Sequence, residues 1–310
     1  MSDKEKTKLE AFADGQTMQK RQLPKRKKLN KQESVRKKVK TTRQKKEQPR
    51  PAVILEHFTD KIEEEYNVIF KPNVGPQTDF LAASEREVLY GGSAGGGKSY
   101  AMLADPLRYM GNPAFSGLLL RHTTEELREL ITKSQEMYPK IWPGIKWSER
   151  KMQWTAPSGA KLWLSYLDKD QDVTRYQGLA FSWIGFDELT QWGTPFAWNY
   201  MRSRLRTADP ELPLSMRATT NPGGRGHGWV KKMFIDPAPA GKSFIATEIE
   251  TGEQLKYPAG HAKAGKPLFK RRFIPARLKD NPYLAEQGDY EAMLLSLPEQ
   301  QRRQLLDGDW

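Results

Sequence analysis

A glycine-rich stretch constrains this chain more than any other feature. Residues 92–99 read GSAGGGKS, in which two glycines separated by four residues precede Lys98 and Ser99. Residues 87–90 before this stretch are typical of a short buried strand, and residues 100–109 after it are typical of a helix. A strand, a glycine loop and a helix in this order form a phosphate loop, the nucleotide-binding element of P-loop NTPases.

The composition of the loop indicates how it would bind a nucleoside triphosphate. Glycines let consecutive backbone N–H groups converge on phosphate oxygens, and the N-terminus of the following helix adds positive charge. We expect Lys98 to reach the β and γ phosphates and the Ser99 hydroxyl to ligate Mg²⁺. The sequence thus predicts an ATP and Mg²⁺ site formed by Gly92, Gly95, Gly96, Gly97, Lys98 and Ser99.

An acidic pair follows a second apolar run, residues 181–186. Because the end of a strand holds an acid rigidly, we expect Asp187 to hold Mg²⁺ through its water shell. Glu188 is expected to orient and deprotonate the attacking water, which distinguishes a hydrolysing ATPase from a phosphate-transferring kinase. Such a pair also fits the start of an ordinary loop, but its coexistence with the glycine loop favours catalysis.

A third polar motif ends the apolar strand predicted over residues 214–220. Thr219, Thr220 and Asn221 place two hydroxyls and an amide there, followed by Pro222 and two glycines. These groups could sense the γ phosphate and pass its presence to the glycine loop that follows. A cap at the entry to a helix is the alternative interpretation.

The order of the predicted elements indicates the fold class. Strands alternate with helices, which favours an α/β fold with a mainly parallel central sheet flanked by helices and the active edge at the strands' C-terminal ends. We also predict a helix over residues 123–138 capped by Thr123 or Thr124, and a hairpin over residues 152–164. Residues 252–270 are expected to form a mobile surface loop, and residues 283–306 a helix interrupted by Pro298.

Charge is concentrated at the N-terminus. Residues 1–50 contain 18 basic and six acidic residues, whereas the whole chain has a net charge of +13. With few large apolar groups, this segment cannot bury enough surface to offset its ordering entropy, so we expect a disordered basic tail preceding an ATPase domain over residues 51–310. The tail could bind nucleic acid or an acidic partner, or serve only to keep the chain soluble.

The sequence also disfavours cysteine chemistry and membrane association. The chain has no cysteine, which excludes disulfides, thiolate catalysis and cysteine-based zinc sites. No apolar run approaches the roughly 20 residues that span a bilayer, so no membrane association is expected.

Taken together, the motifs resemble the N-terminal ATPase domain of the large terminase subunit of tailed phages. The resemblance covers about residues 70–310 and includes the closing sequence LDGDW (residues 306–310). It implies a motor that uses ATP to drive double-stranded viral DNA into a preformed capsid. It also implies that Gln77 reads adenine and that Thr219, Thr220 and Asn221 couple hydrolysis to movement.

The family resemblance also implies partners and a location. We expect a homo-oligomeric ring that docks transiently on the portal protein of the capsid, in the cytoplasm of the infected host cell, together with the small terminase subunit. Members of the family carry a separate nuclease domain, which we expect to be absent from this chain, either removed or present as a separate chain.

One departure from the family concerns arginine. Many terminases have an arginine inside the phosphate loop, whereas this loop has none. We therefore expect an arginine from elsewhere, supplied by a neighbouring subunit, to neutralise the transition state; the candidates are Arg204, Arg175 and Arg121. Each of them also fits an ordinary surface or ion-pairing role.

Two other functions remain open at this stage. A helicase-like or other DNA-translocating ATPase shares the first two motifs, although helicases of this type carry two such domains. A non-hydrolysing, nucleotide-gated DNA adaptor is the second alternative, and the intact set of Lys98, Ser99, Asp187 and Glu188 argues against it.

Overall fold

The computed structural model of the chain describes residues 68–310. The predicted basic tail over residues 1–50 lies outside the described residues. Within the described part, no helix has both the length and the apolar character needed to cross a membrane.

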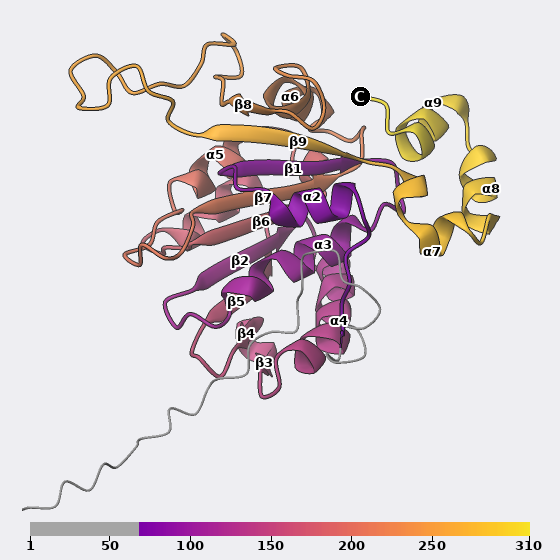
Figure 1. Cartoon of the computed structure of the whole chain (residues 1–310), viewed down its shortest axis with the longest axis horizontal. Helices are drawn as coiled ribbons and strands as arrows, with labels where there is room; N and C mark the ends of the chain where they lie inside the picture. Colours follow the sequence, from indigo (N-terminus) through magenta and orange to yellow (C-terminus); the bar gives the residue numbers. More distant parts are fainter. Residues whose placement is uncertain (1–67) are drawn as a thin grey trace, which may run out of the picture. The chain divides into compact units, whose positions relative to one another are not determined.

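The described residues form one nine-stranded sheet that is parallel at its centre (Figure 1). Its strands are β1 (Glu87–Gly92), β2 (Ser116–Arg121), β3 (Lys146–Ser148), β4 (Gln153–Thr155), β5 (Lys161–Tyr166), β6 (Trp183–Asp187), β7 (Ser215–Thr220), β8 (Ser243–Ile245) and β9 (Lys270–Ala276). The order is β3-β4-β5-β2-β6-β7-β1-β9-β8. The six neighbouring strands β5, β2, β6, β7, β1 and β9 are parallel to one another, while β3, β4 and β8 pair antiparallel with their neighbours. The predicted fold class is confirmed.

Short helices connect these strands. The α-helices are α2 (Pro76–Ala82), α3 (Lys98–Ala104), α4 (Thr124–Ile141), α5 (Phe196–Arg202), α6 (His227–Val230), α7 (Pro282–Ala285), α8 (Asp289–Leu295) and α9 (Glu299–Arg302). The 3₁₀ helices are η1 (Asp105–Tyr109), η2 (Glu149–Lys151), η3 (Asp170–Tyr176), η4 (Leu189–Gln191) and η6 (Leu278–Asp280). Two π-helical turns, η5 (Lys231–Ile235) and η7 (Arg303–Asp307), continue α6 and α9.

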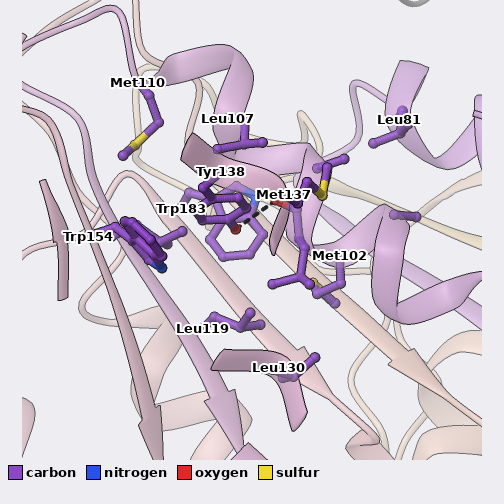
Figure 2. Packing of buried hydrophobic residues seen from close by; sticks show 14 of the residues in the cluster. Leu81, Met102, Leu107, Met110, Leu119, Leu130, Met137, Tyr138, Trp154 and Trp183 are labelled. Carbon is purple, nitrogen blue, oxygen red and sulfur yellow. Dashed lines mark hydrogen bonds between the residues drawn. The ribbon is translucent and has the colours of Figure 1, made fainter. Parts of the chain in front are cut away.

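Apolar clusters cover both faces of the sheet, which explains why its central strands are apolar without alternation. Every residue of β1, β6 and β7 is buried. One cluster joins the sheet to α2, α3 and α4; Figure 2 shows Tyr138, Trp154 and Trp183 packed together at its centre. The other cluster contains Trp192 and Trp198 and joins the sheet to α5 and α6.

The best local predictions concern elements with strong end signals. Thr123 caps α4 through a capping box, since its hydroxyl accepts from the Glu126 N–H at 3.3 Å and the Glu126 carboxylate accepts from the Thr123 N–H. The predicted hairpin is present as β4 and β5, with Gly159 at a positive φ of 98° in the turn. Both predictions are confirmed.

Candidate nucleotide-binding site

The phosphate loop runs from the end of β1 to the start of α3. Gly92 has a φ of 136° and Gly97 a φ of 73°, backbone conformations that L side chains rarely adopt. A side chain at Gly92 would also collide with the backbone of Ala276, and one at Gly97 would lie 2.8 Å from the Gln77 amide nitrogen. The glycines are therefore required by the path of the loop as well as by access for phosphate.

Lys98 connects this loop to the end of β7. Its side chain is only 7% exposed, and its Nζ donates to the Ser93 carbonyl at 2.6 Å and to the Asn221 Oδ1 at 2.7 Å. Burial lowers the pKa of Lys98, while the nearby Glu188 and Asp187 carboxylates oppose that shift. The structure thus brings Lys98, the predicted phosphate-binding residue, into direct contact with Asn221, the predicted coupling residue.

Asp187 is the last residue of β6 and is fully buried. The Thr219 hydroxyl donates to its Oδ1, and the Arg121 Nε lies 3.0 Å from its Oδ2. These contacts follow from strand order, because β7 and β2 flank β6 on either side. They hold the carboxylate in one orientation at the carboxyl edge of the sheet.

Glu188 follows in the left-handed region, with a φ of 59° that is uncommon for a residue with a side chain. Its Oε2 accepts from the Asn221 N–H at 3.3 Å. Burial raises the pKa of Glu188, and the neighbouring Asp187 raises it further; Lys98 and Arg121 oppose the shift. A partly buried carboxylate with a raised pKa, on a residue with strained backbone geometry, is typical of a catalytic base.

The third motif lies between the other two, since β7 pairs with both β1 and β6. The Thr220 hydroxyl lies 2.7 Å from that of Thr190, whose N–H also donates to it. Thr190 belongs to η4, directly after Glu188. Sequence analysis did not predict this residue, because its role depends on a partner 30 positions away.

The oxygen donors at this edge of the sheet fit Mg²⁺. Magnesium prefers carboxylate and hydroxyl oxygens together with phosphate and water. The Asp187 carboxylate supplies one such group, and Ser99 lies in the first turn of α3, next to Lys98. The predicted metal ligands are therefore on the two strand–loop connections that frame the site.

Gln77 lies beside the phosphate loop, as its predicted role requires. It is 4% exposed; its Nε2 donates to the Gly97 carbonyl at 2.9 Å, and its Oε1 accepts from the Asn73 N–H at 2.6 Å. Both ends of its amide are thus engaged with backbone. Adenine recognition by Gln77 remains a prediction.

The arginine candidates lie in three different places. Arg121 is buried at the end of β2 against Asp187, whereas Arg175 is about half exposed on η3, with its Nη2 donating to the Tyr166 carbonyl at the end of β5. Arg204 lies at the opposite edge of the sheet, because its carbonyl accepts from Phe181, just before β6 begins. Only Arg121 contacts the residues of the site.

C-terminal residues also contact the phosphate loop, which sequence analysis did not anticipate. The Leu305 carbonyl accepts from the Ala94 N–H at 2.7 Å, and the Asn281 Nδ2 donates to the Gly95 carbonyl at 2.7 Å. Trp310 packs against Gly91, where a Cβ would lie 3.3 Å from its ring. These contacts join residues at least 186 positions apart in the sequence, so no local pattern could reveal them.

Comparisons with known proteins identify the family. The family described as terminase large subunit, T4likevirus-type, N-terminal, matches residues 89–310, which is most of the chain. The chain belongs to the large terminase family. None of the curated proteins compared with this terminase chain matches it.

Solved structures of large terminases share the fold at low sequence identity. The large terminase from a thermophilic bacteriophage in complex with ADP has a TM-score of 0.53 and 14% identity, over 77% of this chain and 54% of the other. The same protein with ATP-γ-S gives a TM-score of 0.52, 15% identity and coverages of 77% and 53%. The large terminase ATPase domain from a Thermus phage has a TM-score of 0.49 and 13% identity, over 81% of this chain and 98% of the other. This terminase chain spans about half the length of the thermophilic phage protein.

Proposed function

We propose that this chain is the ATP-hydrolysing motor domain that powers translocation of double-stranded viral DNA into a preformed capsid. The observation that carries the proposal is the contact between Lys98, Asn221 and Glu188 at the carboxyl edge of the sheet. This contact unites a phosphate-binding cation, a partly buried carboxylate and a polar strand end at one point. The thermophilic phage terminase, which shares the fold, was solved in complex with ADP and with ATP-γ-S.

The residues of the site divide the work of ATP hydrolysis among them. The loop amides and Lys98 bind the β and γ phosphates, so that Lys98 exchanges its bonds to Ser93 and Asn221 for phosphate oxygens. Glu188 accepts a proton from water as the water oxygen attacks the γ phosphorus, and the bond to the ADP oxygen breaks. Ser99 and Asp187 would hold Mg²⁺, which neutralises charge on the phosphates.

The same contacts give the site a way to report its state. When Lys98 turns toward phosphate, Asn221 loses a hydrogen bond, and its backbone remains tied to Glu188. The Asn221 side chain is then free to follow the loop that begins at Pro222. This supports the assignment of Thr219, Thr220 and Asn221 to coupling.

An arginine from a neighbouring subunit completes the site in this proposal. Arg175 is the better candidate, since it is exposed at the carboxyl end of β5, on the same edge of the sheet as Asp187. Arg204 remains a candidate only if the subunits pack so that opposite edges of the sheet meet. Either arginine can reach the site of a neighbour only in an assembled homo-oligomeric ring, which we propose by analogy with large terminases.

The proposed partners are double-stranded DNA, the portal protein and the small terminase subunit, and the proposed location is the host cytoplasm at the capsid portal. The activity that we assign to the described residues is ATP hydrolysis; we assign them no nuclease activity.

A phosphate-release assay of the full chain tests this function. We expect turnover of ATP that increases when double-stranded DNA is added. Binding of ATP without phosphate release would instead support a nucleotide-gated adaptor. Stimulation by single-stranded DNA together with strand separation would support a helicase-like enzyme.

A further inference from the structure

The connection between β8 and β9 forms a hydrogen-bonded arm, defined here as residues 246–269. The Leu255 N–H donates to the Ala246 carbonyl and the Leu268 N–H to the Leu255 carbonyl. Further along, Tyr257 and Lys266 are joined by a backbone hydrogen bond of 2.9 Å. Figure 1 shows the arm in orange, extending beyond β8 and β9 at the end of the sheet away from α7, α8 and α9. The segment predicted as a mobile surface loop, residues 252–270, thus lies at the surface and contains backbone hydrogen bonds between its two sides; its mobility stays a prediction.

In the outer part of the arm and at the first residue of β9, lysines are the only residues with a formal charge. Residues 254–270 contain Lys256, Lys263, Lys266 and Lys270 and no acidic residue. All four lysines are exposed, and within residues 68–310 none of them forms an ion pair. Four exposed lysines without acidic partners create a local positive potential.

The acidic residues of the arm, Glu248, Glu250 and Glu253, all precede residue 254, and within residues 68–310 none of them forms an ion pair with the lysines that follow. Glu248 turns back onto its own segment, where its Oε2 accepts from the Glu250 N–H at 2.8 Å and the Thr251 N–H at 2.6 Å. These bonds hold the pKa of Glu248 below its ordinary value, so it stays ionised within its turn. Glu250 lies 3.8 Å from Lys232, outside the arm.

An aromatic stack shapes the tip. The rings of Tyr257 and His261 are 4.5 Å apart and nearly parallel, and the Lys263 Nζ lies 5.7 Å from the centre of the Tyr257 ring. The His261 Nδ1 accepts from the Lys263 N–H at 3.0 Å. These contacts fix the turn that carries Lys263, so its charge is presented from an ordered support.

The base of the arm is anchored in the sheet by cations. The Phe269 ring lies under the guanidinium groups of Arg202, Arg271 and Arg86, at 5.2, 5.6 and 5.9 Å. Arg271 also donates to the Thr247 carbonyl at 2.7 Å and pairs with the buried Glu87. The arm therefore leaves the sheet in a defined direction.

We propose that this arm binds the phosphate backbone of double-stranded DNA through Lys256, Lys263 and Lys266. The inference rests on the proposed motor function, which supplies a polyanion that matches these exposed lysines. Contacts of this kind are independent of base sequence and sensitive to salt.

The arm is also placed to communicate with the phosphate loop. The arm continues into β9 at Lys270. All of β1 pairs with β9, from Glu87 opposite Arg271 to Gly92 opposite Ala276. The Ala276 carbonyl accepts from the Ser93 N–H at 2.9 Å. One strand thus connects the DNA contact to the loop that binds phosphate.

The test compares two full-length variants with equal loss of charge. The first replaces Lys256, Lys263 and Lys266 by glutamine. The matched control replaces Lys146, Lys151 and Lys161, which are exposed on β3, η2 and β5. In the strand order, β3 and β5 are on the side of the sheet opposite to β8 and β9. Binding of a fluorescent 30-base-pair duplex is measured by anisotropy between 50 and 200 mM salt, and ATP turnover is measured without DNA.

We expect the arm variant to flatten the salt dependence by about one unit of slope per lysine, about three in all. Between the two salt concentrations, wild-type affinity should then fall about 60-fold more than that of the variant. The control should keep the wild-type slope, and both variants should keep basal turnover. Equal slopes in all three proteins, or equal flattening in both variants, would overturn the proposal for the arm alone. Absence of any DNA binding by the wild type would contradict the proposed motor as well.

Discussion

At the residue scale, the partly buried Glu188 and the fully buried Glu87 have opposite environments. Burial and Asp187 raise the pKa of Glu188 at the carboxyl edge of the sheet. At the other edge, burial alone would raise the pKa of Glu87, but Arg271 and Arg202 hold it below its ordinary value. The first environment suits a group that exchanges a proton, and the second suits a permanent anion.

Glu188→Gln should separate binding from hydrolysis. The amide keeps the shape of the side chain and its place beside Asn221, but it cannot accept a proton from water. We expect ATP binding close to that of the wild type and turnover roughly 10² to 10⁴ slower. Nucleotide titration and phosphate release measure the two effects, with the exposed Glu211→Gln as control. Weak binding combined with normal turnover would show that the role is wrongly assigned.

Glu87→Gln should destabilise the fold in a pH-dependent way. A buried charge that loses its partner costs about 3–5 kcal/mol, here in the unfolding free energy at pH 7. Because the folded pKa of Glu87 is depressed, its contribution is complete above its ordinary value of 4.5 and is lost as the pH falls through the folded pKa. Urea unfolding should therefore give a deficit that shrinks below about pH 4.5. A deficit that is constant with pH would contradict this assignment.

At the element scale, local signals predicted local structure. The phosphate loop between β1 and α3 and the capped start of α4 depend on neighbours within a few positions. Strand order could not be predicted in the same way, because it is set by packing between distant segments. The pairing of Arg121 with Asp187 follows from β2 lying next to β6. Arg121 was therefore visible in the sequence only as one candidate arginine among three.

The C-terminal segment was predicted less well. Residues 283–306 were expected to be helical, with a break at Pro298, and the structure divides them into α7, α8, α9 and η7. Gly288, with a φ of 68°, is the N-cap residue of α8, and Pro298 is the N-cap residue of α9, so a new helix begins after each of them. The contact of Leu305 with the phosphate loop orients these pieces, and that contact has no signature in the sequence.

Nucleotide binding should disturb this contact. The Ala94 N–H that donates to Leu305 belongs to the loop that would bind phosphate, and Trp310 packs on the adjacent Gly91. We expect ATP to change the intrinsic fluorescence of the protein and Trp310→Phe to remove most of that change. Comparison of the two titrations at equal nucleotide saturation provides the measurement. An unaltered change in the Trp310→Phe protein would rule out movement of this segment.

At the scale of the whole molecule, we expect an arginine of another subunit to complete the site. Arg175→Ala should lower turnover of the assembled protein by roughly 10³ to 10⁵, as for other trans-acting arginines. Mixing it with Glu188→Gln protein should restore part of the activity, because each variant supplies the group that the other lacks. Arg204→Ala is measured in parallel, with the exposed Arg206→Ala as control. Loss of turnover in the Arg204 variant alone would transfer the role to that residue.

The central claim is that Lys98 and the residues around it hydrolyse ATP. Removal of its charge should weaken phosphate binding and take away the one cation that the phosphate loop itself supplies to the transition state, because this loop contains no arginine. The most direct measurement is phosphate release by full-length wild type and Lys98→Ala, with circular dichroism and thermal unfolding to show that both are folded. We predict DNA-stimulated turnover in the wild type and none above background in Lys98→Ala. Turnover near the wild-type rate in a folded Lys98→Ala protein would contradict the account.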